Sequence, residues 1–264
     1  MNSFVKLWLD TVKEKNSLLC VGIDPAEHAQ RPDRALKKSE SKVHWSKHLI
    51  KEVAPYAAAI KPNRNYFKDL SREELKEIND YAHSFGLLSI DDSKIADIGD
   101  TNDSAIYHAA KESFDYITYA PFPGNIEAAC EQSKRHDVGL ITLALMSNPE
   151  YALIKNATIE GEKAYKVFCQ KVAKSDGCGV VIGAPSEKNH LEISEIETAK
   201  EILGEKLVLV PGVGAQGGDC EEIIRIFKDL AMINVGRAIT YSENPAEQAK
   251  KYQLEFNAIR EKHS

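Results

Sequence analysis

Short apolar runs recur along the chain, and segments with helical patterning separate them. Most of the runs are nearly continuous in hydrophobic residues, which is typical of parallel strands buried on both faces. Eight runs show this pattern: 18–23, 57–61, 87–92, 116–119, 139–145, 179–182, 207–210 and 232–235. Strands that alternate with helices predict β-α-β units and therefore a parallel sheet.

The segments between the runs carry the signals of helix ends. In segment 71–86, Ser71 is a candidate N-cap, Glu74 completes a capping box and Gly86 follows the last turn. Pro245 stands near the first turn of the C-terminal segment. Eight such units predict an α/β protein with one (β/α)8 barrel, a TIM barrel, and a doubly wound open sheet is the alternative.

Nothing in the sequence divides the chain into domains. It has no linker rich in Pro, Gly or Ser, and no repeat beyond the strand and helix alternation. We therefore predict a single barrel domain over residues 1–264. Segment 25–47 is charged and poorly patterned, so we predict an inserted loop with a helical end.

Composition and charge limit the classes of partner. The net charge is −6, and acidic and basic residues are interspersed, which argues against a nucleic-acid or anionic membrane partner. The N-terminal segment 1–15 is amphipathic and charged throughout, unlike a signal peptide, and no run approaches the roughly 20 apolar residues of a membrane span. We expect a cytoplasmic protein. No C-x-x-C pair suggests zinc or a redox centre among its cysteines, Cys20, Cys130, Cys169, Cys178 and Cys220.

Charged residues close the first three predicted strands. Asp24 follows the first, Lys61 ends the second and Asp92 ends the third, after which the string DDSKIADIGDTN adds Lys94 and Asp97. Catalytic side chains of barrels lie at these carboxyl ends of the strands. One such charge is most often a solvated loop residue, but these converge. We therefore expect two ammonium groups and two carboxylates to alternate at one mouth of the barrel.

An array of this kind has a chemical use. A lysine between carboxylates keeps its charge and can act as a general acid toward a developing carbanion. A carboxylate beside a departing substrate carboxylate opposes it until CO2 leaves. A Schiff-base lysine is an alternative, but it needs a desolvated neutral amine. Mg²⁺ held by Asp91, Asp92 and Asp97 is another, which the interleaved lysines oppose.

The last two predicted units contain a candidate phosphate site. The string VPGVGAQGGD follows the seventh strand and VGRAI follows the eighth, where barrels commonly hold phosphate. Gln216 and Arg237 can donate side-chain hydrogen bonds, Arg237 as a charged fork. Backbone N–H groups could approach an anion closely at four glycines, Gly212, Gly214, Gly217 and Gly218. The alternative role of these glycines is turn formation.

Two other polar residues lie outside these two groups. Ser147, in the string LMSNP after the fifth strand, can present a hydroxyl to a polar ring edge, although serine before Asn-Pro is usually a turn residue. His108 falls on a predicted helix after the third strand. We predict a structural role for it.

Six ordered blocks resemble the orotidine 5′-phosphate decarboxylases: VGIDP, IKPN, DSKIADIGDTN, LMSNP, PGVGAQGGD and VGRAI. The string DSKIADI is similar to the D-x-K-x-x-D-I signature of that family. The resemblance implies an enzyme without metal or organic cofactor that converts orotidine 5′-phosphate to uridine 5′-phosphate and CO2, the last step of de novo pyrimidine biosynthesis. Segment 25–47 is similar to the longer form of the family.

The resemblance also implies a role for each matching residue. Lys61, Asp92, Lys94 and Asp97 resemble a charged tetrad in which Lys94 protonates C6 of the pyrimidine. Asp97, with Ile98 and Thr101, resembles the part of the site that one subunit lends to its partner in a homodimer. The other expected substrate contacts are Asp24 to the ribose, Ser147 to the pyrimidine, Pro211 and Val213 along the pocket wall, and Gln216, Gly236 and Arg237 to the phosphate.

Two rival functions remain open at this point. Sugar-phosphate enzymes resembling 3-keto-gulonate 6-phosphate decarboxylase or hexulose-phosphate synthase share a similar motif, but they use Mg²⁺ and carry an acidic residue in place of Lys61. A barrel that binds a nucleotide phosphate without catalysis would need only the glycine-rich loop.

Overall fold

The computed structural model of the chain describes residues 1–31, 36, 40–175, 177–186, 189–214 and 220–263. Within them, parallel strands close into a barrel in the order β1-β10-β9-β8-β5-β4-β3-β2. The predicted (β/α)8 barrel is confirmed. The open-sheet alternative is wrong, because each strand of a closed barrel has hydrogen-bonded neighbours on both sides. The strands are β1 (Leu19–Ile23), β2 (Ala59–Pro62), β3 (Leu88–Ile95), β4 (Tyr116–Tyr119), β5 (Gly139–Leu145), β8 (Gly179–Ile182), β9 (Leu207–Val210) and β10 (Ala231–Val235).

Strand β3 differs most from its prediction. The apolar run ends at Asp92, yet the strand continues to Ile95. Its register against β4 shifts between Asp91 and Ile95, and Lys94 adopts a left-handed backbone with φ of 50°. Lys94, expected just after the strand, therefore lies within an irregular part of it. The bounds of β4, β5, β8 and β9 coincide with the predicted runs.

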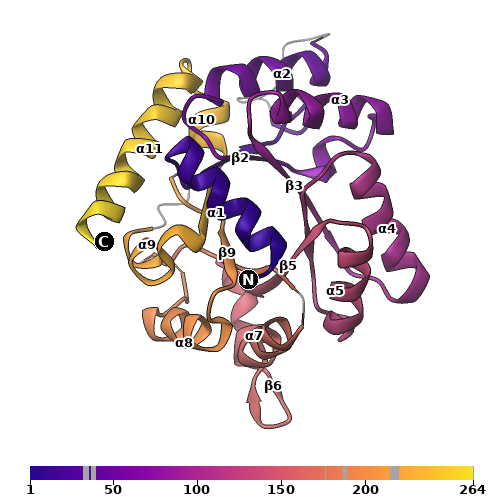
Figure 1. The fold of residues 1–264 in the computed structure, drawn as a ribbon, viewed down its shortest axis with the longest axis vertical. Coiled ribbons are helices and arrows are strands. Elements are labelled where there is room, and N and C mark those ends of the chain that lie inside the picture. Colours follow the sequence, from indigo (N-terminus) through magenta and orange to yellow (C-terminus); the bar gives the residue numbers. More distant parts are fainter. Residues whose placement is uncertain (32–35, 37–39, 176, 187–188, 215–219, 264) are drawn as a thin grey trace.

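Helices surround the barrel (Figure 1). The helix between β2 and β3 has the predicted capping box, in which Ser71 N donates to Glu74 Oε2 at 2.8 Å and Glu74 N donates to Ser71 Oγ at 3.2 Å. Pro245 is the first residue of the last helix, as expected. The outer helices are α2 (Lys42–Val53), α3 (Arg72–His83), α4 (Gly99–Lys111), α5 (Ile126–Arg135), α7 (Ala164–Lys174), α8 (Ile193–Leu203), α9 (Glu221–Phe227) and α11 (Pro245–Lys262).

Shorter elements fill several connections. They are the 3-10 turns η1 (Arg64–Tyr66), η2 (Pro149–Tyr151) and η3 (Lys228–Leu230), the helices α6 (Ala152–Asn156) and α10 (Arg237–Thr240), and a hairpin of β6 (Thr158–Ile159) and β7 (Glu162–Lys163). No helix among the described residues has both the length and the apolar character needed to cross a membrane.

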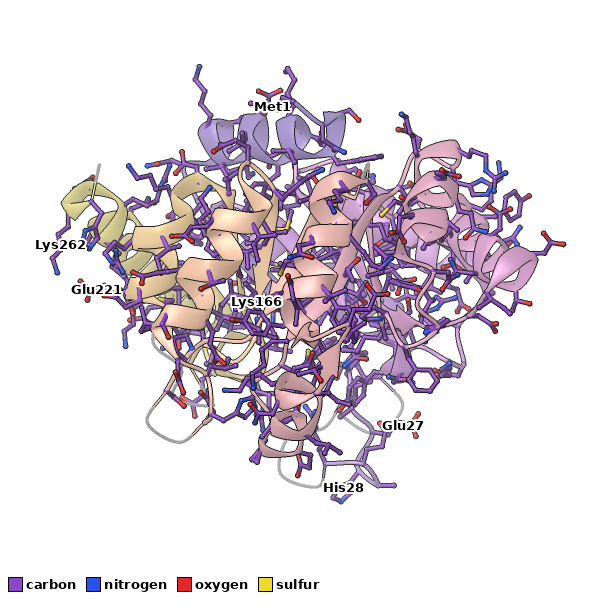
Figure 2. All side chains as sticks on the ribbon, turned by 90° about the horizontal axis from the view of Figure 1, so that it is seen from below. Met1, Glu27, His28, Lys166, Glu221 and Lys262 are labelled. Atoms are coloured by element: carbon purple, nitrogen blue, oxygen red, sulfur yellow. The ribbon has the colours of Figure 1, made fainter. Side chains whose placement is uncertain are left out.

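Helix α1 (Ser3–Lys15) covers the amino ends of the barrel strands, as Figure 1 shows. Trp8 is fully buried and its Nε1 donates to the carbonyl of Asp229 at 2.8 Å, while the Tyr116 hydroxyl donates to the carbonyl of Phe4 at 2.7 Å. Figure 2 places Met1 at this end of the molecule, and Glu27 and His28, which follow β1, at the other. The open mouth is therefore the end where the strands have their carboxyl termini.

Within the predicted insertion 25–47, α2 already begins at Lys42. The described part of the insertion is attached to the barrel. Ala26 N donates to the Tyr241 hydroxyl at 3.0 Å, and Lys42 Nζ donates to Asp69 Oδ1 at 2.6 Å. The last residues of the segment are thus helical, which agrees with the expected helical end.

Candidate active site

Three of the predicted charges meet inside the mouth of the barrel. Lys61 is the next-to-last residue of the buried strand β2, and its Nζ donates to Asp92 Oδ2. Lys94 Nζ donates to the other oxygen of the same carboxylate, Asp92 Oδ1, at 2.5 Å. Lys61 and Asp92 are only 6% and 7% exposed, whereas the Lys94 side chain is 39% exposed. The carboxylate thus joins one buried ammonium group to one that opens toward the mouth.

The irregular part of β3 is held by a residue that sequence reasoning missed. Lys94 N donates to Thr118 Oγ1 at 2.9 Å, and the Thr118 hydroxyl lies 3.2 Å from the carbonyl oxygen of Asp91, to which it donates. Thr118 stands on β4 in the run YITY. The one signal for it is a small polar residue between apolar neighbours of a buried strand.

The electrostatics of this group follow from burial and proximity. Burial alone would raise the pKa of Asp92, but Lys61 and Lys94 hold it well below the usual range of a carboxyl. Burial opposes the charge of Lys61, yet Asp92 and Asp24 together raise its pKa. Burial also raises the pKa of the neighbouring Cys20 thiol to about 12. Asp92 and Lys61 are therefore both charged at neutral pH.

Asp91 and Asp92 lie on opposite faces of β3, as consecutive residues of a strand do. Asp92 contacts Lys61 and Lys94, whereas Asp91 feels the charges of Arg64 and Glu112 on the helix side. The two carboxylates therefore cannot share one cation. Among the described residues, Asp91, Asp92 and Asp97 do not gather into a group that could hold a metal ion.

Asp97, Ile98 and Thr101 lie at the edge of the mouth and are exposed. Among the ion pairs of the described residues, none joins Asp97 to Lys61 or Lys94, and its Oδ1 accepts from Ile98 N at 2.8 Å. Ile98 is 61% exposed. Within one chain, the expected array of four charges therefore consists of three.

Asp24 follows β1 and is half-buried. Its carbonyl accepts from the Tyr241 hydroxyl, and its Oδ2 lies 3.9 Å from Nη2 of Arg31, a residue of the insertion. Asp24 also contributes to the raised pKa of Lys61. These facts place Asp24 within electrostatic range of the charged group, on the side of β1.

Ser147 follows β5 and packs against the end of β8. A Cβ atom on Gly183 would come 2.7 Å from Ser147 Cβ and 2.8 Å from its backbone nitrogen. Only glycine permits this approach. Sequence reasoning missed Gly183, although a glycine directly after the run GVVI was a visible signal. Pro211 and Val213 follow β9, and Ala184 N donates to the carbonyl of Pro211 at 2.9 Å.

The candidate phosphate site is described only in part. Gly212 and Gly214 adopt positive φ values of 99° and 81°, which favour glycine. Gly236 and Arg237 follow β10 at the start of α10, and Arg237 is half-buried. Thr240 Oγ1 donates to the carbonyl of Gly22 at 2.6 Å, which fixes α10 against β1. Gln216, Gly217 and Gly218 lie outside the described residues.

A cavity of about 770 Å³ lies elsewhere, between α1, α8, α9 and α11. Leu9, Phe227 and Arg260 contribute to its wall, and none of the predicted site residues does. Its lining mixes both signs of charge and gives no chemical reason to link it to the charged group in the mouth.

Comparison with known proteins identifies the family of the chain and agrees with its barrel fold. The model of the Orotidine 5'-phosphate decarboxylase / HUMPS family matches residues 17–252. The orotidine 5'-phosphate decarboxylase of Azoarcus sp. (strain BH72) is 31% identical over 242 residues, 87% of each chain. The structure of Leishmania donovani OMP decarboxylase superposes with a TM-score of 0.76 at 25% identity and covers 96% of this chain and 98% of that one.

A longer protein is also similar. The structure of Leishmania donovani UMP synthase has a TM-score of 0.80 at 26% identity and covers 95% of this chain, which spans 56% of the synthase. Because the family model matches most of its length, the chain belongs to the orotidine 5′-phosphate decarboxylase / HUMPS family.

Proposed function

We propose that this chain is a carboxy-lyase that decarboxylates orotidine 5′-phosphate to uridine 5′-phosphate and CO2, in pyrimidine biosynthesis. The observation that carries the proposal is the buried carboxylate of Asp92 between Lys61 and Lys94. Relatives that cover most of the chain bear the name of this activity. The cytoplasmic location and the single domain expected from the sequence stay predictions.

In the proposed mechanism, the substrate carboxylate lies against Asp92. The two negative charges repel each other, and this repulsion ends as the bond between C6 and the carboxylate breaks and CO2 leaves. The electron pair of that bond stays on C6. Lys94, the more exposed of the two lysines, donates a proton from Nζ to C6 and is reprotonated from water. Lys61 stays charged and orients Asp92.

Binding far from C6 would supply the energy for this arrangement. Asp24 would hold the ribose with Lys61, and Ser147 would hold the pyrimidine against the pocket wall of Pro211 and Val213. Gln216, Gly236 and Arg237 would hold the phosphate. Such contacts place the reacting carbon beside Lys94, so that remote binding energy is used at C6.

Lys94→Ala tests the proton donor. We expect decarboxylation to fall by at least about 10²-fold, the contribution of a positioned acid, while uridine 5′-phosphate still binds. The assay follows the ultraviolet absorbance of orotidine 5′-phosphate with protein kept in EDTA, and calorimetry measures product binding. Wild-type protein without activity would reject the function, and sensitivity of that activity to EDTA would favour the Mg²⁺-dependent sugar-phosphate enzymes. Activity retained by the variant above about one percent would reject only the role of Lys94.

We further propose that Asp97, Ile98 and Thr101 enter the site of a second copy of the chain. The support is that Asp97 is exposed and outside the three-charge group, and that Ile98 offers an exposed apolar surface beside it. A homodimer would then complete each site with a fourth charge. If the site is shared in this way, two inactive variants should restore activity when they form a mixed dimer, which a monomer could not do.

Mixing two inactive variants tests the sharing. In a population of Lys94→Ala and Asp97→Asn subunits that exchange at random, half of the dimers are mixed and each has one intact site. Activity should therefore recover to about one quarter of the wild-type value. Light scattering measures the oligomeric state in the same samples. No recovery despite proven exchange would contradict the proposal.

A further inference from the structure

A second group of buried charges lies behind the candidate site, on the helix side of β3. Arg64 Nη2 donates to Glu112 Oε1 at 2.8 Å, and the Glu112 side chain is 5% exposed. Asp91, only 4% exposed, interacts electrostatically with both. One guanidinium thus faces two buried carboxyl groups. None of the three residues is among those predicted for substrate or catalysis.

This cluster of Asp91, Arg64 and Glu112 has unused hydrogen-bonding groups. Asp91 Oδ1 and Arg64 Nη1 are both buried and have no hydrogen-bond partner. Burial raises the pKa of Asp91 to about 7, and burial also raises that of Glu112. Asp91 therefore holds its proton through much of the range below neutral pH. A neutral Asp91 leaves the single guanidinium to Glu112, which it already binds.

Each member of the cluster belongs to a segment that carries a site residue. Asp91 directly precedes Asp92, and its carbonyl accepts from the threonine that also binds the backbone of Lys94. Arg64 is in η1, three positions after Lys61. Glu112 is the residue that directly follows α4, the helix that begins just after Ile98. A displacement of these three side chains would therefore also displace the adjoining ends of β2, β3 and α4.

The cluster is also surrounded by fixed contacts. The carbonyl of Glu112 accepts from Asn79 Nδ2 at 2.7 Å, and Asn79 Oδ1 accepts from Ser89 Oγ of β3 at 2.6 Å. Other charges act on it from the outside, since Arg72 of α3 and His108 of α4 both lower the pKa of Glu112. Asp92 opposes ionisation of Asp91 from the barrel side, and the Ser93 side chain favours it.

We propose that Asp91, Arg64 and Glu112 are positioning residues, which hold the part of β3 that carries Asp92 and Lys94 in place from the outer face of the barrel. The proposal rests on the proposed function, because the reaction reports on that position. Ionisation of Asp91 adds a third carboxylate to those of Asp92 and Glu112, and Arg64 is the cation bound on the outer face, because Lys61 and Lys94 are bound to Asp92 on the inner face. Their repulsion should displace Asp92 and Lys94 and slow the reaction.

The test compares pH profiles of wild type and Asp91→Asn, which keeps the shape of the side chain without its charge. In wild type, kcat should fall at least about threefold as the pH rises through about 7, with KM nearly constant, because a small misplacement of reacting groups lowers the rate. Asp91→Asn should lack this step. Asp115→Asn is the matched control, since Asp115 binds Ser89 N at 2.7 Å and His83 Nε2 at 2.9 Å at the start of β3, away from the site. It should keep the wild-type profile.

Arg64→Lys provides a second measurement. It keeps the positive charge but loses the fork, and kcat should fall by about 10-fold to 100-fold with KM changed less than about twofold. Identical pH profiles of wild type and Asp91→Asn, or wild-type kcat in a folded Arg64→Lys, would overturn the proposal. Failure of the function itself is recognised separately, as a wild type without decarboxylation. In that case the NMR resonances of the Lys94 side chain test the positioning. They should shift near pH 7 in wild type and not in Asp91→Asn. A wild type without that shift refutes the positioning.

Discussion

Lys61 and Lys94 bind the same carboxylate, yet they should contribute to stability very differently. Lys61 and Asp92 are both buried, and loss of one partner from a buried pair commonly costs about 3–5 kcal/mol. Asp92 keeps Lys94 when Lys61 is removed, so we expect Lys61→Met to lower the free energy of unfolding by about 3 kcal/mol, the low end of that range. Lys94 is 39% exposed, and its pair with Asp92 should contribute less than about 1 kcal/mol.

Equilibrium unfolding in urea, followed by circular dichroism, measures both losses. Lys61→Met and Lys94→Met should both lose decarboxylation, so activity cannot explain a difference in stability between them. Lys47→Met is a control for the substitution itself. Lys47 pairs with Glu77 on the surface, where both side chains are about one third exposed or more, and its loss should change stability by less than about 0.5 kcal/mol.

A double variant separates the ion pair from the space that it fills. Lys61→Met with Asp92→Leu replaces the buried pair by apolar side chains, and such replacements are often neutral or stabilising. It should therefore be more stable than Lys61→Met alone, while remaining inactive. Equal losses for Lys61→Met and Lys94→Met, or a double variant less stable than the single one, would show that burial does not govern these contributions.

The remaining predictions concern Asp91, Gly183 and Cys20. Burial raises the pKa of Asp91 to about 7. Its contribution to stability is present below about pH 4, where the unfolded carboxyl is also protonated, and is lost as the pH rises through about 7. Asp91→Asn should flatten this decline in the free energy of unfolding, measured in urea. Gly183→Ala should lower both Tm and kcat, because its Cβ would come 2.7 Å from Ser147 Cβ, and an unchanged variant would mean that Ser147 moves aside freely. Cys20 should resist a thiol reagent in the native protein, since burial raises its pKa to about 12, and rapid labelling would contradict this.

The barrel was readable from the sequence because buried parallel strands are apolar on both faces, so each interrupts the helical pattern as a short continuous run. The end of β3 was not readable for the same reason. Its last residues, Ser93 to Ile95, follow two charged residues at the end of the predicted run and look like a loop. The pairing of Ile95 with Tyr119 of β4 keeps them in the strand, although the backbone of Lys94 is left-handed.

The site was readable as far as it depends on chain order. Carboxyl ends of parallel strands share one mouth, so Lys61 and Asp92 were expected to meet, and they do. Contacts that depend on three-dimensional packing could not be predicted from the sequence. Thr118 binds the backbone of Lys94, and Gly183 lies against Ser147, through close contacts that the order of the strands does not specify. The distance of Asp97 from the other charges likewise follows from the path of β3 beyond its irregular part.

Asp91 and Asp92 are neighbours of the same residue type, both buried, yet their pKa values shift in opposite directions. Burial raises the pKa of each, so the difference comes from the charges on the two faces of β3. Asp92 has two lysines bound to its oxygens, whereas Asp91 shares one arginine with Glu112, to which that arginine is already bound. The ionised carboxylate that the proposed chemistry needs therefore exists only on the inner face. A variant that moved a cation from the inner to the outer face should therefore raise the pKa of Asp92 and lower that of Asp91.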